Sequence, residues 1–360
     1  MVPAGSGRQT GGMRATTIHA PFDIRSDDVA EPSVLRPTDA VVRVTASCVC
    51  GSDLWRYRGE SDFTPGARIG HEFVGVVEAV GEAVSTVTVG DFVITPFTWG
   101  DNTCRNCANG INASCENGGG YGMTDREGML VDGGQGELVR VPLADGTLVS
   151  TPTMPSESQL PDLLALSDVM GTGWHCARGA DVEAGDTVAV IGDGAVGLSA
   201  VLAARLMGAA RIIVMSRHEA RQQIATEWGA SDIVEKRGEA GEATVLQLTD
   251  GLGVDAALEC VGTDAAMQTA IAVTRPAGRV GYVGVPHGIE MPMGTLFSKN
   301  LRLGGGVASV RQYLPELRDR VLAGEIHPGR VFDLQLPLAE VAEGYAAMHE
   351  RRSIKTMLLP

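Results

Sequence analysis

Apolar and polar positions follow two different patterns along the chain. Up to about residue 150, short β-branched runs such as AVVRVTASC, EFVGVVEAV and DFVITPF are separated by Gly, Pro and Asp. Runs of this kind predict short strands joined by turns, and therefore a β-rich domain of barrel type. The first run, MRATTIHA, begins at Met13, and we expect the polar, glycine-rich residues 1–12 before it to form a flexible extension.

From about residue 170 the pattern changes to an apolar strand, a glycine turn and an apolar helix. The run DTVAVIG is followed by DGAVGLSAVLAARLMGA, and RIIVMS, HEARQQIATEWGA and SDIV continue the alternation. This alternation predicts an α/β domain with a parallel sheet covered by helices on both faces. The tail from about Tyr313 contains two amphipathic helix candidates and a closing strand, IKTMLLP.

The composition of the chain limits the kinds of molecule that this protein is expected to bind. The chain has 29 basic and 44 acidic residues, and its net charge of -15 repels nucleic acid and anionic membrane surfaces. No apolar run approaches the ~20 residues that span a bilayer, and the N-terminal residues lack a hydrophobic signal segment. We therefore expect a cytoplasmic protein that acts on a small molecule and binds neither nucleic acid nor membranes.

A glycine-rich turn follows the predicted strand DTVAVI. It lies between an apolar strand and an apolar helix, where the pattern G-x-G-x-x-G binds a dinucleotide. Its glycines permit a tight turn, a close approach of the backbone to the pyrophosphate and close packing of the helix. We expect the side chain of Asp193 to face solvent; a glycine turn in an unrelated βα unit is the alternative. The residues of the turn are Gly192, Asp193, Gly194, Ala195, Val196 and Gly197.

The end of the next strand predicts which cofactor is bound. NAD-specific sites place an acidic residue about twenty positions after the glycines, where it binds the ribose hydroxyls. Here Ser216 and Arg217 stand at that end, with no carboxylate. Hydroxyl and guanidinium groups can bind the 2′-phosphate of NADP(H), so we predict NADP(H) over NAD(H). Arg221 is a further phosphate candidate; alternatively, Arg217 is solvated and Glu219 binds the ribose.

Cys50, His71 and Asp168 offer a thiolate, an imidazole and a carboxylate, a set that suits one zinc ion. They stand in the motifs CGSD, GHEFVGVVEAVG and LSDVMGTGWH. Three protein ligands leave the fourth tetrahedral position for water or substrate, as a catalytic zinc requires. Glu72, next to His71, is a weaker candidate for the same site. Alternatively, the three residues are a core cysteine, a structural histidine and a helix cap.

These motifs, in this order from about Met13 to the C-terminus, resemble those of the zinc-dependent medium-chain alcohol dehydrogenases. The resemblance implies a β-rich, GroES-like catalytic domain of residues 13–170 and 313–360. It also implies an intervening Rossmann domain, a doubly wound parallel sheet formed by residues 171–312. The return of the tail to the first domain rests on the resemblance alone. Relatives form dimers or tetramers, so we expect a homodimer or a homotetramer.

A second zinc site is predicted in the loop after Trp99. Clustered cysteines fit metal ligation better than disulfides in a cytosolic enzyme. Their spacing matches the structural zinc lobe of the family, except that Asp101 stands where the family usually has a cysteine. A carboxylate can replace that thiolate, whereas a lobe without metal and with free thiols is the alternative. The expected ligands are Asp101, Cys104, Cys107 and Cys115.

The resemblance also assigns roles close to the expected catalytic zinc. Ser52 matches the hydroxyl that relays the substrate proton, and Asp53 matches the acceptor that orients His71. Trp55 departs from the pattern, because many relatives have a proton-relaying histidine there. Lys355 matches a basic residue near the pyrophosphate, although a surface lysine is the alternative.

The aromatic residues Trp55, Phe97 and Trp99 suggest a pocket for a mainly hydrophobic aldehyde or alcohol, unless they pack in the core. The turn Gly281–Gly288 resembles the strand end whose backbone receives the nicotinamide amide. We therefore expect a zinc-dependent, NADP(H)-preferring alcohol dehydrogenase or aldehyde and ketone reductase. The alternatives are a polyol or amino-alcohol dehydrogenase, a zinc-free quinone or enoyl reductase, and a non-catalytic NADPH-binding protein.

Overall fold

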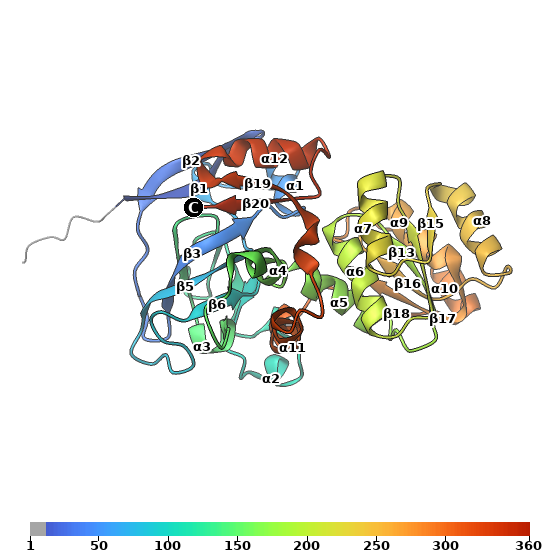
Figure 1. Ribbon diagram of the computed structural model, residues 1–360, viewed down its shortest axis with the longest axis horizontal. Coiled ribbons are helices and arrows are strands. Elements are labelled where there is room, and N and C mark those ends of the chain that lie inside the picture. Colours follow the sequence, from blue (N-terminus) through green and yellow to red (C-terminus); the bar gives the residue numbers. More distant parts are fainter. Residues whose placement is uncertain (1–11) are drawn as a thin grey trace, which may run out of the picture.

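The computed structural model describes residues 12–360 and has two lobes joined by a narrow central region (Figure 1). Residues 1–11, most of the expected extension, lie outside the described residues, and the first strand begins at Gly12 rather than at Met13. The N-terminal and C-terminal parts of the chain lie together in one lobe, and the middle of the chain forms the other (Figure 1).

The first lobe is built on a sheet with the strand order β12-β6-β5-β3-β20-β19, and β11 pairs with β3. The C-terminal strand β20 enters this sheet antiparallel to β3, with Met357 opposite Cys48. The buried pattern of β3 explains its central place, since valines from both of its faces are covered. The strands are β3 (Ala40–Cys48), β5 (Phe73–Val80), β6 (Phe92–Thr95), β11 (Leu138–Val141), β12 (Val149–Ser150), β19 (Phe332–Pro337) and β20 (Lys355–Leu359).

Smaller elements complete this lobe. One sheet has the order β2-β1-β4, and two further strand pairs, β7 with β8 and β9 with β10, lie in the loops. These strands are β1 (Gly12–Ala20), β2 (Asp23–Ala30), β4 (Ala67–Arg68), β7 (Thr98–Trp99), β8 (Gly119–Gly120), β9 (Met123–Thr124) and β10 (Leu130–Val131). The helices are α1 (Asp53–Tyr57), α2 (Arg105–Ala108), α3 (Ala144–Thr147) and α12 (Val341–His349), with the 3₁₀ turns η1 (Asn112–Ser114), η2 (Glu157–Gln159), η3 (Pro328–Val331) and η4 (Leu338–Glu340).

The second lobe contains a parallel sheet with the order β15-β14-β13-β16-β17-β18. From β13 the chain first adds strands on one side, as β14 and β15, and then returns to add β16 on the other side of β13. The strand order therefore reverses between β13 and β16. Open α/β sheets bind their ligands at such a reversal. Helices lie on both faces of the sheet (Figure 1). Its strands are β13 (Thr187–Ile191), β14 (Arg211–Met215), β15 (Asp232–Val234), β16 (Val254–Glu259), β17 (Thr274–Tyr282) and β18 (Arg302–Gly305). The helices are α6 (Ala195–Leu206), α7 (Glu219–Glu227), α8 (Gly238–Leu248), α9 (Asp264–Val273) and α10 (Met293–Lys299).

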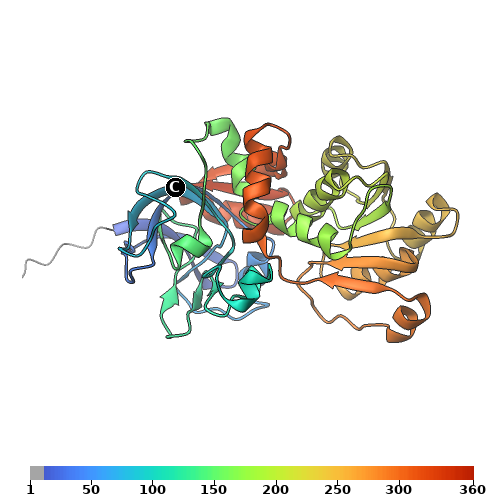
Figure 2. The same cartoon turned by 90° about the horizontal axis from the view of Figure 1, so that it is seen from below.

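Three helices connect the lobes: α4 (Leu160–Ala165), α5 (Val169–Gly179) and α11 (Val310–Leu322). Helix α5 packs against α6 and β17 of the second lobe, and α11 packs against α5, α4 and β12. Figure 2 shows α11, in orange-red, standing between the lobes. One cluster of buried side chains continues from Ile94 in the first lobe to Leu258 in the second. In residues 12–360, none of the helices has the length and apolar content needed to cross a membrane.

Candidate functional site

Three of the expected ligands meet where β3, β5 and α5 come together. Cys50 follows β3, and His71 precedes β5, the antiparallel neighbour of β3, so the two residues lie at the same end of the sheet. Asp168 is the N-cap residue of α5. One of its oxygens, Oδ1, accepts a 2.6 Å hydrogen bond from the Thr172 hydroxyl, and the other, Oδ2, faces the cluster. The Thr172 hydroxyl thus orients the Asp168 carboxylate and leaves Oδ2 available to a ligand.

The distances within this cluster fit one tetrahedral metal ion. Asp168 Oδ2 lies 3.7 Å from Cys50 Sγ and 3.5 Å from His71 Nε2. Zinc bonds of about 2.0–2.3 Å place tetrahedral ligands ~3.3–3.8 Å apart. One ligand atom from each of Cys50, His71, Glu72 and Asp168 lies within 4.8 Å of the others. Burial raises the pKa of the Cys50 thiol, and nearby Glu72 raises it further. A bound cation would reverse that effect, because it stabilises the thiolate.

Glu72 and Lys355 form a fully buried pair behind these ligands. Lys355 Nζ lies 2.7 Å from Glu72 Oε1 and donates a further 3.2 Å hydrogen bond to the Val49 carbonyl. The other oxygen of Glu72 accepts from the Cys48 thiol at 3.2 Å. The resemblance implied that Lys355 lies near the pyrophosphate, and the alternative was a surface lysine. The residue is only 1% exposed, so it is not a surface lysine, and its neighbour here is Glu72.

A buried polar network positions His71 and the Cys50 backbone. Asp53 Oδ1 lies 3.5 Å from His71 Nδ1, and Asp53 Oδ2 accepts a 3.0 Å hydrogen bond from the Cys50 amide. Gln135 Nε2 and the Tyr345 hydroxyl also donate to Asp53 Oδ2, each at 3.4 Å. Sequence reasoning did not identify Gln135 and Tyr345, because neither belongs to a metal-ligand motif and both reach the site from distant elements.

The residues expected around the substrate lie in different environments. Ser52 is the N-cap residue of α1, is partly exposed and has no side-chain hydrogen bond within residues 12–360. The Phe97 ring lies edge-on to the His71 ring, with centroids 6.2 Å apart, so Phe97 borders the metal-ligand cluster. Trp99 is 2% exposed and belongs to the same core cluster as Phe73. The pocket that it borders contains Arg36 and Asp125 and none of the metal-ligand candidates. Trp55 stacks on His287 of the second lobe.

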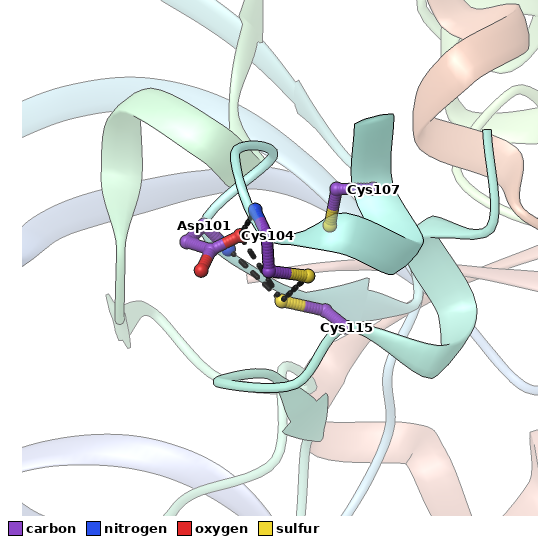
Figure 3. Close-up of side chains that lie close together, drawn as sticks. All are labelled: Asp101, Cys104, Cys107 and Cys115. Carbon is purple, nitrogen blue, oxygen red and sulfur yellow. Dashed lines mark hydrogen bonds between the residues drawn. The ribbon is translucent and has the colours of Figure 1, made fainter. Parts of the chain in front are cut away.

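The four expected ligands of the second zinc site also lie together (Figure 3), around α2 at the lower edge of the first lobe in Figure 1. Cys104 Sγ lies 3.9 Å from Cys115 Sγ, which lies 3.3 Å from Asp101 Oδ1. The Cys107 sulfur points toward the other three side chains (Figure 3). Burial raises the pKa of the Cys107 thiol to about 12, so a thiolate there needs a cation nearby. Three sulfurs and one carboxylate within 4.8 Å fit a closed zinc site.

The glycine turn has the geometry that its pattern predicts. Gly192 has a φ of +114°, which disfavours a side chain. A Cβ atom on Gly197 would lie 2.1 Å from the Gly192 carbonyl oxygen, so α6 packs directly on the turn. Gly194 is the N-cap residue of α6, and a Cβ atom there would meet no atom within 4 Å. The backbone at Gly194 is therefore open to a ligand.

The expectation that Asp193 faces solvent is wrong. The residue is 7% exposed, and its carboxylate turns toward the end of β14. Its Oδ2 accepts a 2.8 Å hydrogen bond from the Ser216 hydroxyl and lies 2.7 Å from His218 Nδ1. Arg221 Nη1 lies 3.4 Å from the other oxygen. The side chain turns inward because a carboxylate between the glycines finds hydrogen-bond donors on the neighbouring strand.

Comparison with known proteins identifies relatives for the whole described chain. Residues 36–153 match the alcohol dehydrogenase GroES-like domain, and residues 195–323 match the zinc-binding dehydrogenase family. A probable zinc-binding alcohol dehydrogenase of Mycobacterium tuberculosis is 37% identical over 342 residues, which cover 94% of this chain and 86% of that protein.

Solved structures of dehydrogenases share the whole fold. The alcohol dehydrogenase TADH from Thermus sp. ATN1 superimposes with a TM-score of 0.88 and 33% identity, over 96% of this chain and 99% of that one. A zinc-binding dehydrogenase from Sinorhizobium meliloti bound to NADP has a TM-score of 0.83 and 25% identity, over 97% and 100% of the two chains.

Proposed function

Because the chain belongs to the family of zinc-dependent medium-chain alcohol dehydrogenases, we propose that it transfers a hydride between NADP(H) and an alcohol, aldehyde or ketone. Its fold combines the GroES-like and Rossmann domains of that family. We assign residues 13–170 and 313–360 to the catalytic domain and residues 171–312 to the cofactor-binding domain.

One observation carries the proposal: one of the zinc-type ligands and the glycine turn stand at the starts of two helices that pack together. Asp168 caps α5, and α5 packs against α6, which follows the glycine turn. Cys50, His71 and Asp168 would hold a zinc ion, which would supply a Lewis acid for the substrate oxygen. Both halves of a hydride transfer, an activated oxygen and an oriented dinucleotide, are then available at the junction of the lobes.

The chain's own residues have distinct roles in this reaction. The free Ser52 hydroxyl hydrogen-bonds the substrate oxygen and passes its proton on. Asp53 holds the His71 ring in one orientation, so that Nε2 faces the other ligands. Phe97 forms an apolar wall beside His71, which favours a mainly hydrophobic substrate.

The preference for NADP(H) is supported by the side chains after β14. Arg217 is exposed, and Ser216 is held by Asp193. Both oxygens of Asp193 already accept from protein groups, so this carboxylate does not bind a ribose hydroxyl pair. The exposed Glu219, in the first turn of α7, is the competing ligand that would favour NAD(H) instead. We also propose a structural zinc bound by Asp101, Cys104, Cys107 and Cys115.

Metal analysis and kinetics of Asp168→Ala test this function, with the exposed Asp28→Ala as control. We expect about two zinc ions per wild-type chain, faster oxidation of NADPH than of NADH across aliphatic and aromatic aldehydes, and at least a hundredfold lower kcat/KM in Asp168→Ala. In Asp101→Ala we expect about one zinc ion and retained catalysis. An Asp168→Ala enzyme as active as the wild type would rule out the catalytic zinc, and a preference for polyols would contradict the apolar pocket.

A further inference from the structure

The buried Asp193 carboxylate organises the segment that follows β14. It accepts from the Ser216 hydroxyl, at 2.8 Å, and from the Arg217 backbone amide, at 3.3 Å. It also lies 2.7 Å from His218 Nδ1 and 3.4 Å from Arg221 Nη1. Burial favours the neutral acid, but the hydrogen bonds from His218 and Ser216 lower the pKa of Asp193 below its ordinary value. Asp193 is therefore an anion with its hydrogen-bonding capacity in use.

Two guanidinium groups next to this segment have no partner. Neither Arg217 nor Arg237 forms a side-chain hydrogen bond or ion pair within residues 12–360. They follow neighbouring strands, since Met215 of β14 pairs with Val234 of β15 and the Ser216 amide donates to the Val234 carbonyl at 3.1 Å. Arg237 is exposed, and its partial desolvation together with the repulsion from Arg217 lowers its pKa, as expected for two close cations.

We propose that Arg237 is a second binding residue for the 2′-phosphate of NADP(H), alongside Arg217, and that Asp193 is the positioning residue of this site. The inference rests on the proposed NADP(H) preference. Arg237 is also the N-cap residue of α8, so the partial positive charge of the helix N-terminus adds to its own charge. Sequence reasoning missed Arg237 because it follows β15. The residues that distinguish NAD(H) from NADP(H) are usually sought at the end of the preceding strand, which here is β14.

The negative charge of Asp193 would repel a phosphate bound nearby, so its place beside this site requires a physical explanation. Asp193 holds the Ser216 hydroxyl and the Arg217 amide in place, and it pairs with Arg221, so that Arg217 and Arg237 keep their donors free. Arg221 is the guanidinium group that pairs with Asp193, and the repulsion between Arg217 and Arg237 shows that these two cations lie near each other. A strand end that is held in place binds a dianion more strongly than a flexible one does, because less conformational entropy is lost on binding.

Calorimetric titration with 2′,5′-ADP and 5′-AMP tests the proposal without turnover, since the two nucleotides differ at the 2′-phosphate. We expect Arg237→Gln to weaken 2′,5′-ADP binding about tenfold, the loss of one charge-assisted hydrogen bond, and to leave 5′-AMP binding unchanged. Arg302→Gln is the matched control, because Arg302 lies on β18, at the opposite edge of the same sheet, and should change neither affinity.

Asp193 is tested by the direction of its effect. Its removal takes away a negative charge, which by itself would tighten binding of an anion. A positioning role predicts the reverse: Asp193→Ala weakens 2′,5′-ADP binding about fivefold or more, and Asp193→Asn, which still accepts from Ser216, weakens it less. Tighter binding of 2′,5′-ADP by Asp193→Ala, or unchanged binding of it by Arg237→Gln, overturns this inference but leaves the proposed NADP(H) preference standing. Equal wild-type affinity for both nucleotides overturns the NADP(H) preference, and the inference with it.

Discussion

The Trp55 indole lies against the His287 imidazole across the junction of the two lobes, with ring centroids 3.5 Å apart and an angle of 25° between the planes. Trp55 belongs to α1, close to Ser52, whereas His287 follows β17 and donates from its amide to the Gly262 carbonyl at 3.0 Å. The Trp55 ring thus joins the two lobes.

This stack predicts an effect on substrate size. Trp55→Ala removes the indole beside Ser52, and His287→Ala removes the surface that holds it, so both changes should favour bulky substrates. We expect the ratio of kcat/KM for a bulky aldehyde to that for a small one to rise at least about fivefold in each variant. Kinetics with a series of aldehydes of increasing size measures this ratio. An unchanged ratio in Trp55→Ala would assign Trp55 to packing alone.

The glycine turn offers a matched pair of substitutions. Gly197→Ala places a methyl group against the Gly192 carbonyl oxygen, so we expect a lower Tm. Gly194→Ala meets no protein atom within 4 Å, so its Tm should equal that of the wild type. Its methyl group instead obstructs the approach of the pyrophosphate, and we expect at least tenfold weaker NADPH binding. Thermal unfolding and NADPH titration separate the two effects; normal NADPH affinity in Gly194→Ala would place the cofactor elsewhere.

The buried Glu72–Lys355 pair predicts a large change in stability. Lys355→Met leaves the Glu72 carboxylate buried without its counterion, and we expect a loss of about 3–5 kcal/mol in the free energy of unfolding. The double variant Glu72→Gln, Lys355→Met should recover much of this loss. Arg352→Met, which breaks exposed pairs with Glu343 and Glu350, is the control and should lower the free energy of unfolding far less than Lys355→Met does. Denaturant unfolding checks all three, and equal losses in Lys355→Met and Arg352→Met would refute the expectation.

The Asp145 carboxylate predicts a pH-dependent contribution to stability. Burial would raise its pKa, but the Thr86 and Ser85 amides and hydroxyls donate to it and lower the pKa below its ordinary value. The stabilisation is therefore complete above the unfolded-state pKa of about 3.9, and it is lost as the pH falls through the lower folded-state value.

Asp145→Asn tests this contribution. We expect a loss of about 1 kcal/mol at pH 7 that shrinks below pH ~4, measured by thermal unfolding at several pH values. Asp28→Asn is the control, because the Asp28 side chain is 81% exposed and should contribute almost nothing. A loss in Asp145→Asn that does not depend on pH would show that charge is not the cause.

Several features of this protein follow from the amino-acid sequence alone. The glycine turn between strand and helix and the parallel sheet were predicted because each depends on residue types at short spacings. The candidate ligands Cys50, His71 and Asp168 were predicted because each stands in a local motif that resembles one of the family. A backbone that requires glycine at Gly192, or an apolar strand covered on both faces, leaves its mark in consecutive residues.

Other features depend on contacts between distant segments, and only the tertiary structure decided them. Asp193 turns inward because β14 brings Ser216 and His218 to it, and Lys355 meets Glu72 because β20 returns to β3. Trp99 packs in the core of the first lobe, whereas Trp55, in α1 of the same lobe, reaches His287 in the other lobe. The direction of a polar or aromatic side chain is set by the partners that the fold brings near, and those partners have no fixed spacing along the chain.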